Sequence, residues 1–297
     1  MRPHRLPRTT ASRRATRATV ARMSHHVACL QTRPVFGAVR ENLDDATTRL
    51  AGVEADLVVL PELFATGYSF RSRDEAMDLA ESWPEGPTVE ALAAISARTG
   101  GMVVGGFVER DGERLFNSAA VLIDGQPRHA YRKLHLFGFE PETFTPGDGP
   151  LPVIEHAGLR VGVMICFDWI FPEAARALAL HGADILAHPS NLVLQWCQRA
   201  MRTRTLENGV YAITANRVGT EHREPRPELP FTGGSLVLDP LGEALAEGPR
   251  DVPALLEAEV DVMRSRDKHV ASGNDRIAER RPEWYGALLR ADTPGAR

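Results

Sequence analysis

Two kinds of apolar pattern alternate along the chain, and they predict two kinds of element. Short continuous apolar runs rich in β-branched residues are typical of buried strands, whereas apolar positions three or four residues apart are typical of helices that cover one face. The first pattern predicts strands at residues 27–31, 56–60, 102–109, 116–123, 127–133, 184–188, 211–216, 234–239, 245–247 and 254–260. The second predicts helices at residues 38–51, 87–98, 172–180 and 194–208. Strands and helices alternate early, so we expect one α/β domain in which two layers of strands are covered by helices on the outside.

Residues 161–173 are the most informative stretch. The apolar run there ends abruptly at Cys166, and Pro172 then opens an amphipathic helix. Proline is favoured in the first turn of a helix because it gives up no hydrogen bond there. Cys166 is therefore predicted to lie on a sharp strand-to-helix turn, the geometry that exposes the nucleophile at the rim of a sheet in other hydrolases.

The composition is that of an ordinary globular protein with a sizeable core. Of the 297 residues, 43% are apolar and 25% are charged. A formal net charge of −4 gives no reason to expect nucleic acid or a membrane surface as partner, and no apolar run reaches the length of a membrane span. The three cysteines (Cys29, Cys166 and Cys197) are too scattered for a disulfide framework or a zinc site. We therefore expect a reduced, cytoplasmic protein that needs no metal and no cofactor.

The first 22 residues differ from the rest of the chain. They contain seven arginines, and no acidic residue occurs before Glu41. A transit peptide has such a composition, but no apolar face recurs at helical spacing, which favours a disordered tail or an extension upstream of a true start at Met23. The predicted organisation is a tail at 1–23, one domain at 24–275 and a C-terminal tail at 276–297.

Three residues that suit acyl transfer stand at the ends of predicted strands, where sites in α/β sheets gather. They are Glu62, Lys133 and Cys166. A carboxylate can take the proton of a thiol, and a lysine can stabilise the charge that develops on an attacked carbonyl or nitrile. A cysteine at a strand end is also a common packing residue, and an isolated glutamate or lysine is usually solvated. Because the three residues are far apart in sequence, their spacing does not decide between these interpretations.

Three motifs in register resemble those of the nitrilase, or carbon–nitrogen hydrolase, superfamily. They are Pro-Glu-Leu-Phe at 61–64, Lys-Leu-His-Leu-Phe at 133–137 and Ile-Cys-Phe-Asp-Trp at 165–169. The resemblance extends from residue 27 to about residue 259. It implies a four-layer αββα sandwich with a Glu-Lys-Cys triad on one rim.

The same resemblance implies a role for each member of the triad. Glu62 is the expected general base, and Lys133 is the cation that stabilises the tetrahedral intermediate. Cys166 is the nucleophile that forms a thioester, which water then hydrolyses. The backbone N–H of Phe167, the residue after the nucleophile, is expected to donate to the oxyanion.

Further residues are expected around the triad. Many family members carry a second glutamate between the lysine and the cysteine, and Glu140, seven residues after Lys133, is preferred over Glu142 for this role. Tyr68, Trp169 and Asn191 are expected to flank the pocket, either by contacting substrate or by packing beside it.

Two histidines invite a catalytic interpretation, but a structural one is preferred for both. His135 lies two residues after Lys133, yet the family pattern gives the role of base to a glutamate. His188 ends an apolar strand, where its ring is expected to hydrogen-bond with buried polar groups.

The residues at the nucleophile indicate the branch of the family. Cys-Phe-Asp at 166–168 resembles the amidases and carbamoylases more than the Cys-Trp-Glu of true nitrilases. We therefore expect an amidase that converts small carboxamides to acid and ammonia. A nitrilase is the alternative, followed by an N-carbamoyl hydrolase in which Arg199, Arg202 or Arg204 would hold a carboxylate. A non-catalytic interaction domain is the remaining alternative.

The resemblance also predicts a homodimer or a higher homo-oligomer. Family members usually pair across the helices after the nucleophile, here 172–180 and 194–208, with C-terminal segments that reach the partner. Trp284 and Tyr285 lie in an otherwise polar tail, and we expect them to dock on a partner or on the core.

Overall fold

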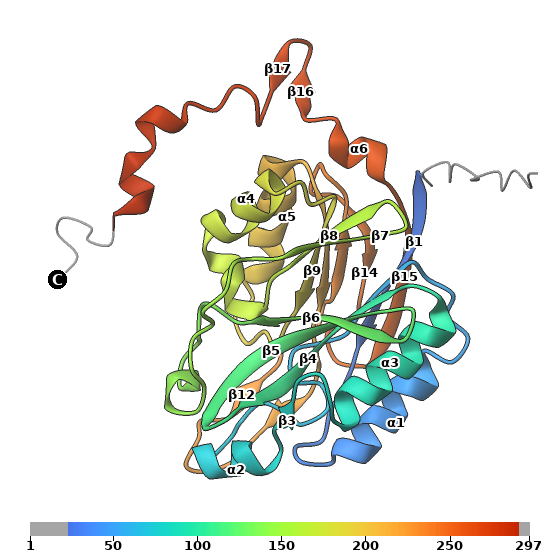
Figure 1. Cartoon of the computed structure of the whole chain (residues 1–297), viewed down its shortest axis with the longest axis vertical. Helices are drawn as coiled ribbons and strands as arrows, with labels where there is room; N and C mark the ends of the chain where they lie inside the picture. Colours follow the sequence, from blue (N-terminus) through green and yellow to red (C-terminus); the bar gives the residue numbers. More distant parts are fainter. Residues whose placement is uncertain (1–22, 291–297) are drawn as a thin grey trace, which may run out of the picture.

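Two β-sheets lie face to face in the computed structural model, which describes residues 23–290 (Figure 1). The first sheet runs in the order β15-β1-β2-β4-β5-β6, and β3 pairs with β4. Its strands are β1 (Ser24–Gln31), β2 (Leu57–Val59), β3 (Glu81–Ser82), β4 (Met102–Asp111), β5 (Arg114–Ile123), β6 (Gln126–Arg132) and β15 (Ala254–Asp261). The second sheet runs in the order β14-β13-β10-β9-β8-β7. Its strands are β7 (Val153–His156), β8 (Leu159–Val163), β9 (Ile185–Pro189), β10 (Tyr211–Ala215), β13 (Leu236–Leu238) and β14 (Ala244–Glu247).

Both faces of the first sheet are buried, as the alternation along β1 shows. Val27 and Cys29 belong to the core between the two sheets, whereas Ala28 and Leu30 belong to the core beneath the outer helices. Side chains alternate between the faces of a strand, so a strand buried on both faces reads as a continuous apolar run. The helices that cover this sheet are α1 (Val39–Arg49) and α3 (Pro87–Thr99).

Two further helices, α4 (Pro172–Leu180) and α5 (Cys197–Asn208), cover the outer face of the second sheet (Figure 1). The described chain is therefore the four-layer αββα sandwich that the sequence predicted. In the centre of each sheet, β1, β2 and β4 run parallel, as do β8, β9 and β10. The segments that follow β2, β8 and β9 carry Glu62, Cys166 and Asn191 respectively.

The elements that the apolar pattern did not predict are short or polar, so they carry too few periodic positions to be detected. They are α2 (Arg73–Asp78), β3, β7, β11 (Thr220–Glu221), β12 (Leu229–Pro230), α6 (Val262–Arg266), β16 (His269–Ala271), β17 (Asn274–Asp275) and four 3₁₀ turns, η1 (Glu140–Glu142), η2 (Cys166–Ile170), η3 (Pro282–Trp284) and η4 (Gly286–Leu289). Helix α5 begins at Cys197 rather than at residue 194. The predicted tail at 1–23 lies almost entirely outside the described residues, and the domain boundaries stay predictions.

After α6 the chain is still tied to the end of α5, where Lys268 donates to the carbonyls of Asn208 and Gly209 at 3.1 and 2.8 Å. Beyond this contact the C-terminal segment extends away from the body of the molecule (Figure 1). The side chain of Trp284 is 76% exposed and that of Leu289 is 91% exposed. The side chain of Trp284 therefore does not dock on the described part of its own chain, whereas that of Tyr285 is 40% exposed, and docking on a partner stays a prediction.

A glycine in β4 allows the close approach of the backbone that carries Glu62. A Cβ atom at Gly106 would lie 2.5 Å from the Cα of Glu62 and 2.5 Å from the amide nitrogen of Leu63. The N–H of Gly106 also donates to the carbonyl of Pro61 at 3.0 Å. We expect Gly106→Ala to lower the free energy of unfolding by about 1–3 kcal/mol, because two backbones must separate to admit the methyl group.

Gly52→Ala is the matched control, since no atom lies within 4 Å of its Cβ position. Urea unfolding of both variants measures the difference. Equal stabilities would contradict the tight contact between β4 and the Glu62 backbone.

Candidate active site

Glu62, Lys133 and Cys166 come together at one rim of the sandwich, and all three are buried. Glu62 lies in the turn after β2, Lys133 directly follows β6, and Cys166 follows β8 after two residues. Leu63, the residue after Glu62, has a φ of 46°, and Cys166 has a φ of 40°. A non-glycine residue in this left-handed region costs of order 1–3 kcal/mol, so both turns are strained at the point that presents the functional side chain.

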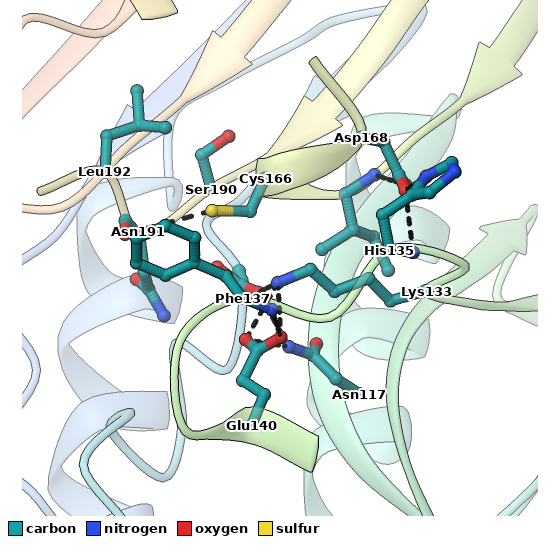
Figure 2. Close-up of polar contacts among 12 residues, drawn as sticks. Asn117, Lys133, His135, Phe137, Glu140, Cys166, Asp168, Ser190, Asn191 and Leu192 are labelled. Atoms are coloured by element: carbon teal, nitrogen blue, oxygen red, sulfur yellow. Dashed lines mark hydrogen bonds and ion pairs between the residues drawn. The ribbon is translucent and has the colours of Figure 1, made fainter. Parts of the chain in front are cut away.

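Lys133 is the centre of the polar cluster (Figure 2). Its Nζ donates to Oε1 of Glu62 at 2.7 Å and to Oε1 and Oε2 of Glu140 at 2.8 and 2.9 Å. Its backbone N–H donates to the carbonyl of Asn117 at 2.9 Å, which fixes the end of β6 against β5. One ammonium therefore joins two carboxylates that are delivered by different loops.

Glu140, and not Glu142, is the second glutamate that contacts Lys133. Glu140 lies in η1 and is buried, and its Oε2 also accepts from the backbone N–H of Phe137 at 2.8 Å. The side chain of Glu142 is 64% exposed and pairs with Arg226 at 2.7 Å. The preference drawn from the sequence spacing agrees with this placement.

Asn117 is a buried member of the cluster that the sequence argument missed. Its Nδ2 donates to Oε1 of Glu62 at 2.6 Å and to Oε1 of Glu140 at 3.1 Å. A signal was present, because an asparagine interrupts the apolar run of β5, where a buried amide needs partners. Nothing in one sequence indicates which partners those are.

The strained turn at Cys166 is held by a buried histidine. His188 Nε2 lies 2.9 Å from the carbonyl oxygen of Cys166, and Nδ1 lies 3.1 Å from the hydroxyl of Thr214. Burial lowers the pKa of His188 to about 4, so the ring is neutral at neutral pH and donates from Nε2 to the Cys166 carbonyl. The structural role expected for His188 is confirmed.

Asp168 fastens the Lys133 loop to the Cys166 turn. Its carboxylate accepts from the backbone N–H of Ile165 at 2.8 Å and from the hydroxyl of Tyr131 at 2.8 Å. It also accepts from the backbone N–H of His135 at 3.2 Å and contacts Nδ1 of that histidine at 2.7 Å (Figure 2). The structural role expected for His135 is confirmed, since its ring pairs with Asp168 and stacks on Phe171.

The charges around Lys133 keep it protonated. Burial disfavours its ammonium, but the carboxylates of Glu140 and Glu62 outweigh burial and raise the pKa of Lys133 above its ordinary value. Burial raises the pKa of Glu140, although the Lys133 ammonium opposes the shift. Lys133 is therefore a fixed positive charge at the rim.

The Cys166 thiol is surrounded by more negative than positive charge. Burial and then the carboxylate of Glu62 raise the pKa of Cys166 well above its ordinary value, and the Lys133 ammonium offsets only part of this shift. A thiol in such a place stays protonated at neutral pH. It can become a nucleophile only when a neighbouring group accepts its proton.

A small pocket opens beside Cys166, and its lining is uncharged. It is lined by Phe137, Cys166, Phe167, Trp169, Asn191, Leu192, Val193 and Leu194. Three of the four expected substrate-binding residues, Phe167, Trp169 and Asn191, therefore lie at the pocket. Both polar atoms of the Asn191 side chain are buried without a hydrogen-bond partner in the described part of the chain.

Tyr68, the fourth expected substrate-binding residue, lies on the carboxylate side of the site. It is buried, and its hydroxyl is within hydrogen-bonding reach of Glu140. Burial and then the carboxylates of Glu140 and Glu62 raise the pKa of Tyr68 well above its ordinary value. The phenol therefore stays protonated and can donate a hydrogen bond.

The arginines considered for binding a substrate carboxylate are absent from the pocket lining. Arg204 donates to the carbonyls of Trp169 and Ile170 at 3.1 and 3.3 Å, which ties α5 to η2. Arg202 donates to the carbonyl of Gly242 at 2.9 Å, and Arg199 is exposed.

Among residues 23–290, no group of three or more histidine, cysteine, aspartate or glutamate side chains is placed to hold a metal ion. No helix in this part of the chain is long and apolar enough to cross a membrane.

The family model for carbon–nitrogen hydrolases matches residues 17–268. The chain belongs to the carbon–nitrogen hydrolase family. A protein from Pyrococcus abyssi named nitrilase is 46% identical over 231 residues, which cover 78% of this chain and 86% of that protein. An N-carbamoylputrescine amidase from Solanum lycopersicum is 30% identical over 280 residues, covering 84% of this hydrolase and 92% of its relative.

Solved structures agree with the family assignment. The carbon–nitrogen hydrolase of Helicobacter pylori G27 superimposes with a TM-score of 0.82 at 27% identity, covering 91% of this hydrolase and all of that chain. A variant of an amidase from Nesterenkonia AN1, a member of the nitrilase superfamily, gives a TM-score of 0.73 at 26% identity and covers 90% and 98% of the two chains. Another variant of that amidase carries the acetamide moiety of fluoroacetamide covalently bound at its active-site cysteine.

The charge around Cys166 predicts that the resting thiol does not ionise near neutral pH. A free cysteine titrates near about pH 8.5, but the pKa of Cys166 is raised well above its ordinary value. We therefore expect the difference in thiolate absorbance between the wild type and Cys166→Ser to stay flat from about pH 6 to about pH 9. Absorbance near about 240 nm measures thiolate directly. A difference signal with a midpoint below about pH 8 would show that the thiol is a thiolate at rest and would contradict this electrostatic picture.

Proposed function

We propose that this hydrolase is an amidase that converts small carboxamides to carboxylic acid and ammonia through a thioester at Cys166. The observation that carries the proposal is the arrangement of two buried carboxylates around one lysine beside a cysteine thiol. Oε1 of Glu62 is occupied by Lys133 and Asn117, whereas its Oε2 is buried and has no hydrogen-bond partner in the described chain. A buried acceptor of this kind is available to take a proton or to accept from an amide N–H.

In the acylation step, Glu62 accepts the thiol proton while the sulfur of Cys166 attacks the carbonyl carbon. The C–S bond forms, and the carbonyl oxygen becomes an oxyanion that the ammonium of Lys133 and the N–H of Phe167 stabilise. Glu62 then returns the proton to the amide nitrogen, the C–N bond breaks, and ammonia leaves a thioester on Cys166. The raised pKa of Cys166 suits this sequence, because the proton leaves the sulfur only when the substrate is in place to be attacked.

In the deacylation step, water takes the position that ammonia has left. Glu62 accepts a proton from the water, the hydroxide attacks the thioester carbonyl, and the same donors stabilise the second oxyanion. The C–S bond breaks, the thiol regains its proton and the carboxylic acid leaves. The sum is one amide and one water converted to one acid and one ammonia.

The pocket supports a small, neutral acyl group. Its walls are formed mainly by phenylalanine, tryptophan, leucine and valine side chains, and none of its lining residues carries a charge. An N-carbamoyl amino acid or a carbamoylated diamine would bring a charge into this space without a counter-ion, which costs several kcal/mol. The N-carbamoyl hydrolase is therefore the third candidate.

A nitrilase is the second candidate, because the relative from Pyrococcus abyssi that bears this name is 46% identical. The triad chemistry would be shared, since a thiol also adds to a nitrile carbon. A nitrile has no N–H, however, and cannot donate to Oε2 of Glu62. The carboxamide therefore fits the polar end of the site better.

The proposed activity is tested by measuring ammonia release from matched small amides, nitriles and N-carbamoyl amino acids. We expect the amides to be hydrolysed with the highest kcat/KM, and we expect Cys166→Ala and Glu62→Gln to lower it by at least about 10²-fold. Cys197→Ala, which removes a buried thiol in α5, is the matched control and should retain the activity. Faster turnover of the matched nitrile would make the nitrilase assignment correct, and an active Cys166→Ala would overturn the mechanism.

We further propose that the hydrolase is a homodimer in which the tail at 276–297 packs on the partner, as the family resemblance implies. The support is the exposed apolar surface of the tail, where Trp284, Leu288 and Leu289 are all more than half exposed. Apolar side chains gathered on an extended segment usually mark an interface.

The assembly is tested with the double variant Trp284→Ser/Leu288→Ser in sedimentation experiments. We expect a dimeric wild type and a dissociation constant raised at least about tenfold in the variant, because two large apolar anchors are lost. Val35→Ser changes an exposed apolar residue in another segment and should leave the dimer unchanged. A monomeric wild type would contradict the proposal.

A further inference from the structure

Asn117 contacts both carboxylates of the polar cluster and the backbone of its lysine. It lies in β5 with almost no exposed surface, and its backbone carbonyl accepts from the backbone N–H of Lys133, whereas its side-chain Oδ1 has no hydrogen-bond partner among the described residues. Its Nδ2 donates to Oε1 of Glu62 at 2.6 Å and to Oε1 of Glu140 at 3.1 Å. Figure 2 shows the amide beside Lys133 and Glu140, below Cys166.

These contacts distribute the donors unequally over the two oxygens of Glu62. Oε1 accepts from both Lys133 and Asn117, whereas Oε2 accepts from no described group. A carboxylate held by two donors at one oxygen cannot rotate without losing both bonds. The amide of Asn117 therefore helps to determine which oxygen of Glu62 is left to take a proton.

The amide of Asn117 also stabilises a cluster in which carboxylates outnumber ammonium groups. Lys133 is shared by two carboxylates, so the buried cluster contains one more negative than positive charge when both glutamates are ionised. A neutral donor stabilises both carboxylates without adding a charge, and hydrogen bonds to a carboxylate favour its ionised form. The neighbouring Ser118 donates to Glu109 at 2.6 Å, so the adjacent residue of the same strand serves a different buried glutamate.

We propose that Asn117 is a positioning residue that orients the carboxylate of Glu62 as the base for Cys166. The proposal rests on the role of Glu62 given under Proposed function. Asn117 touches neither the thiol nor, in this scheme, the substrate. Its effect passes through Glu62, so it should change kcat and its pH dependence more than KM.

Two substitutions of similar size are expected to change the pH dependence of activity in opposite directions. Asn117→Leu removes the donor, which disfavours the ionised form of Glu62, so activity relative to the wild type should fall as the pH is lowered. Asn117→Asp donates only when its new carboxyl is protonated, so activity relative to the wild type should rise as the pH is lowered. At neutral pH we expect Asn117→Leu to reduce kcat by about 10²-fold with KM changed less than about threefold.

The experiment measures kcat and kcat/KM for a small amide from about pH 5 to about pH 9 in the wild type and both variants, after thermal unfolding has shown that they are folded. Asn117→Ser, which keeps a neutral hydroxyl donor, replaces any variant that does not fold and should lose less activity than Asn117→Leu. Ser118→Ala is the matched control on the same strand and should stay within about twofold of the wild type at every pH.

The outcomes separate this inference from the proposed function. Opposite pH trends for the leucine and aspartate variants support the positioning role. Parallel, pH-independent losses would overturn it and leave Asn117 as a packing residue, while the triad would stand. A Glu62→Gln variant that keeps wild-type activity would instead remove the base on which both proposals depend.

Discussion

The site depends on one buried ammonium held between two buried carboxylates. Lys133, Glu62 and Glu140 have almost no exposed surface, and removing any such charge from water costs several kcal/mol unless it is paired. Each partner is delivered by a different segment: the turn after β2, the end of β6 and η1. The loss of one partner would leave the others buried and uncompensated, so the three segments hold their positions together or not at all. Asn117 and the N–H of Phe137 add the neutral hydrogen bonds that complete the cluster.

Burial and the negative charge of this cluster determine the protonation of Cys166, the proposed nucleophile. Many reactive cysteines are activated as thiolates by nearby cations. Here burial and Glu62 raise the pKa of Cys166, so sulfur can attack only as its proton moves to a base. Such a transfer requires accurate placement, and the surroundings of Cys166 provide it. His188 holds the carbonyl of the strained turn, and Asp168 ties that turn to the loop that follows Lys133.

The sequence predicted the layers of the fold because both faces of the central strands are buried, which makes β2 and β8 read as plain apolar runs. It placed Glu62, Lys133 and Cys166 at strand ends, and only the motif resemblance indicated that they meet. Asn117 was missed because its importance comes from a register between β5 and its neighbours that is not visible in a linear pattern. The tail around Trp284 shows another limit: its aromatic residues indicated a buried contact, but residues 23–290 leave the side chain of Trp284 76% exposed.

The hydrogen-bond donors and acceptors of the site also bear on the choice of substrate. The polar end of the site offers a fixed cation and a backbone N–H for an oxygen, together with one unpaired carboxylate oxygen on Glu62. A carboxamide presents an oxygen to the donors and N–H groups to the acceptor, whereas a nitrile presents a single acceptor. A buried acceptor left unpaired costs about 1–3 kcal/mol, roughly 5- to 150-fold in relative binding. Water can fill that place in a roomy site, but the pocket beside Cys166 is small and lined mainly by apolar side chains. The proposed preference for amides therefore rests on the unpaired oxygen of Glu62 and on the amide of Asn117, which leaves that oxygen unpaired.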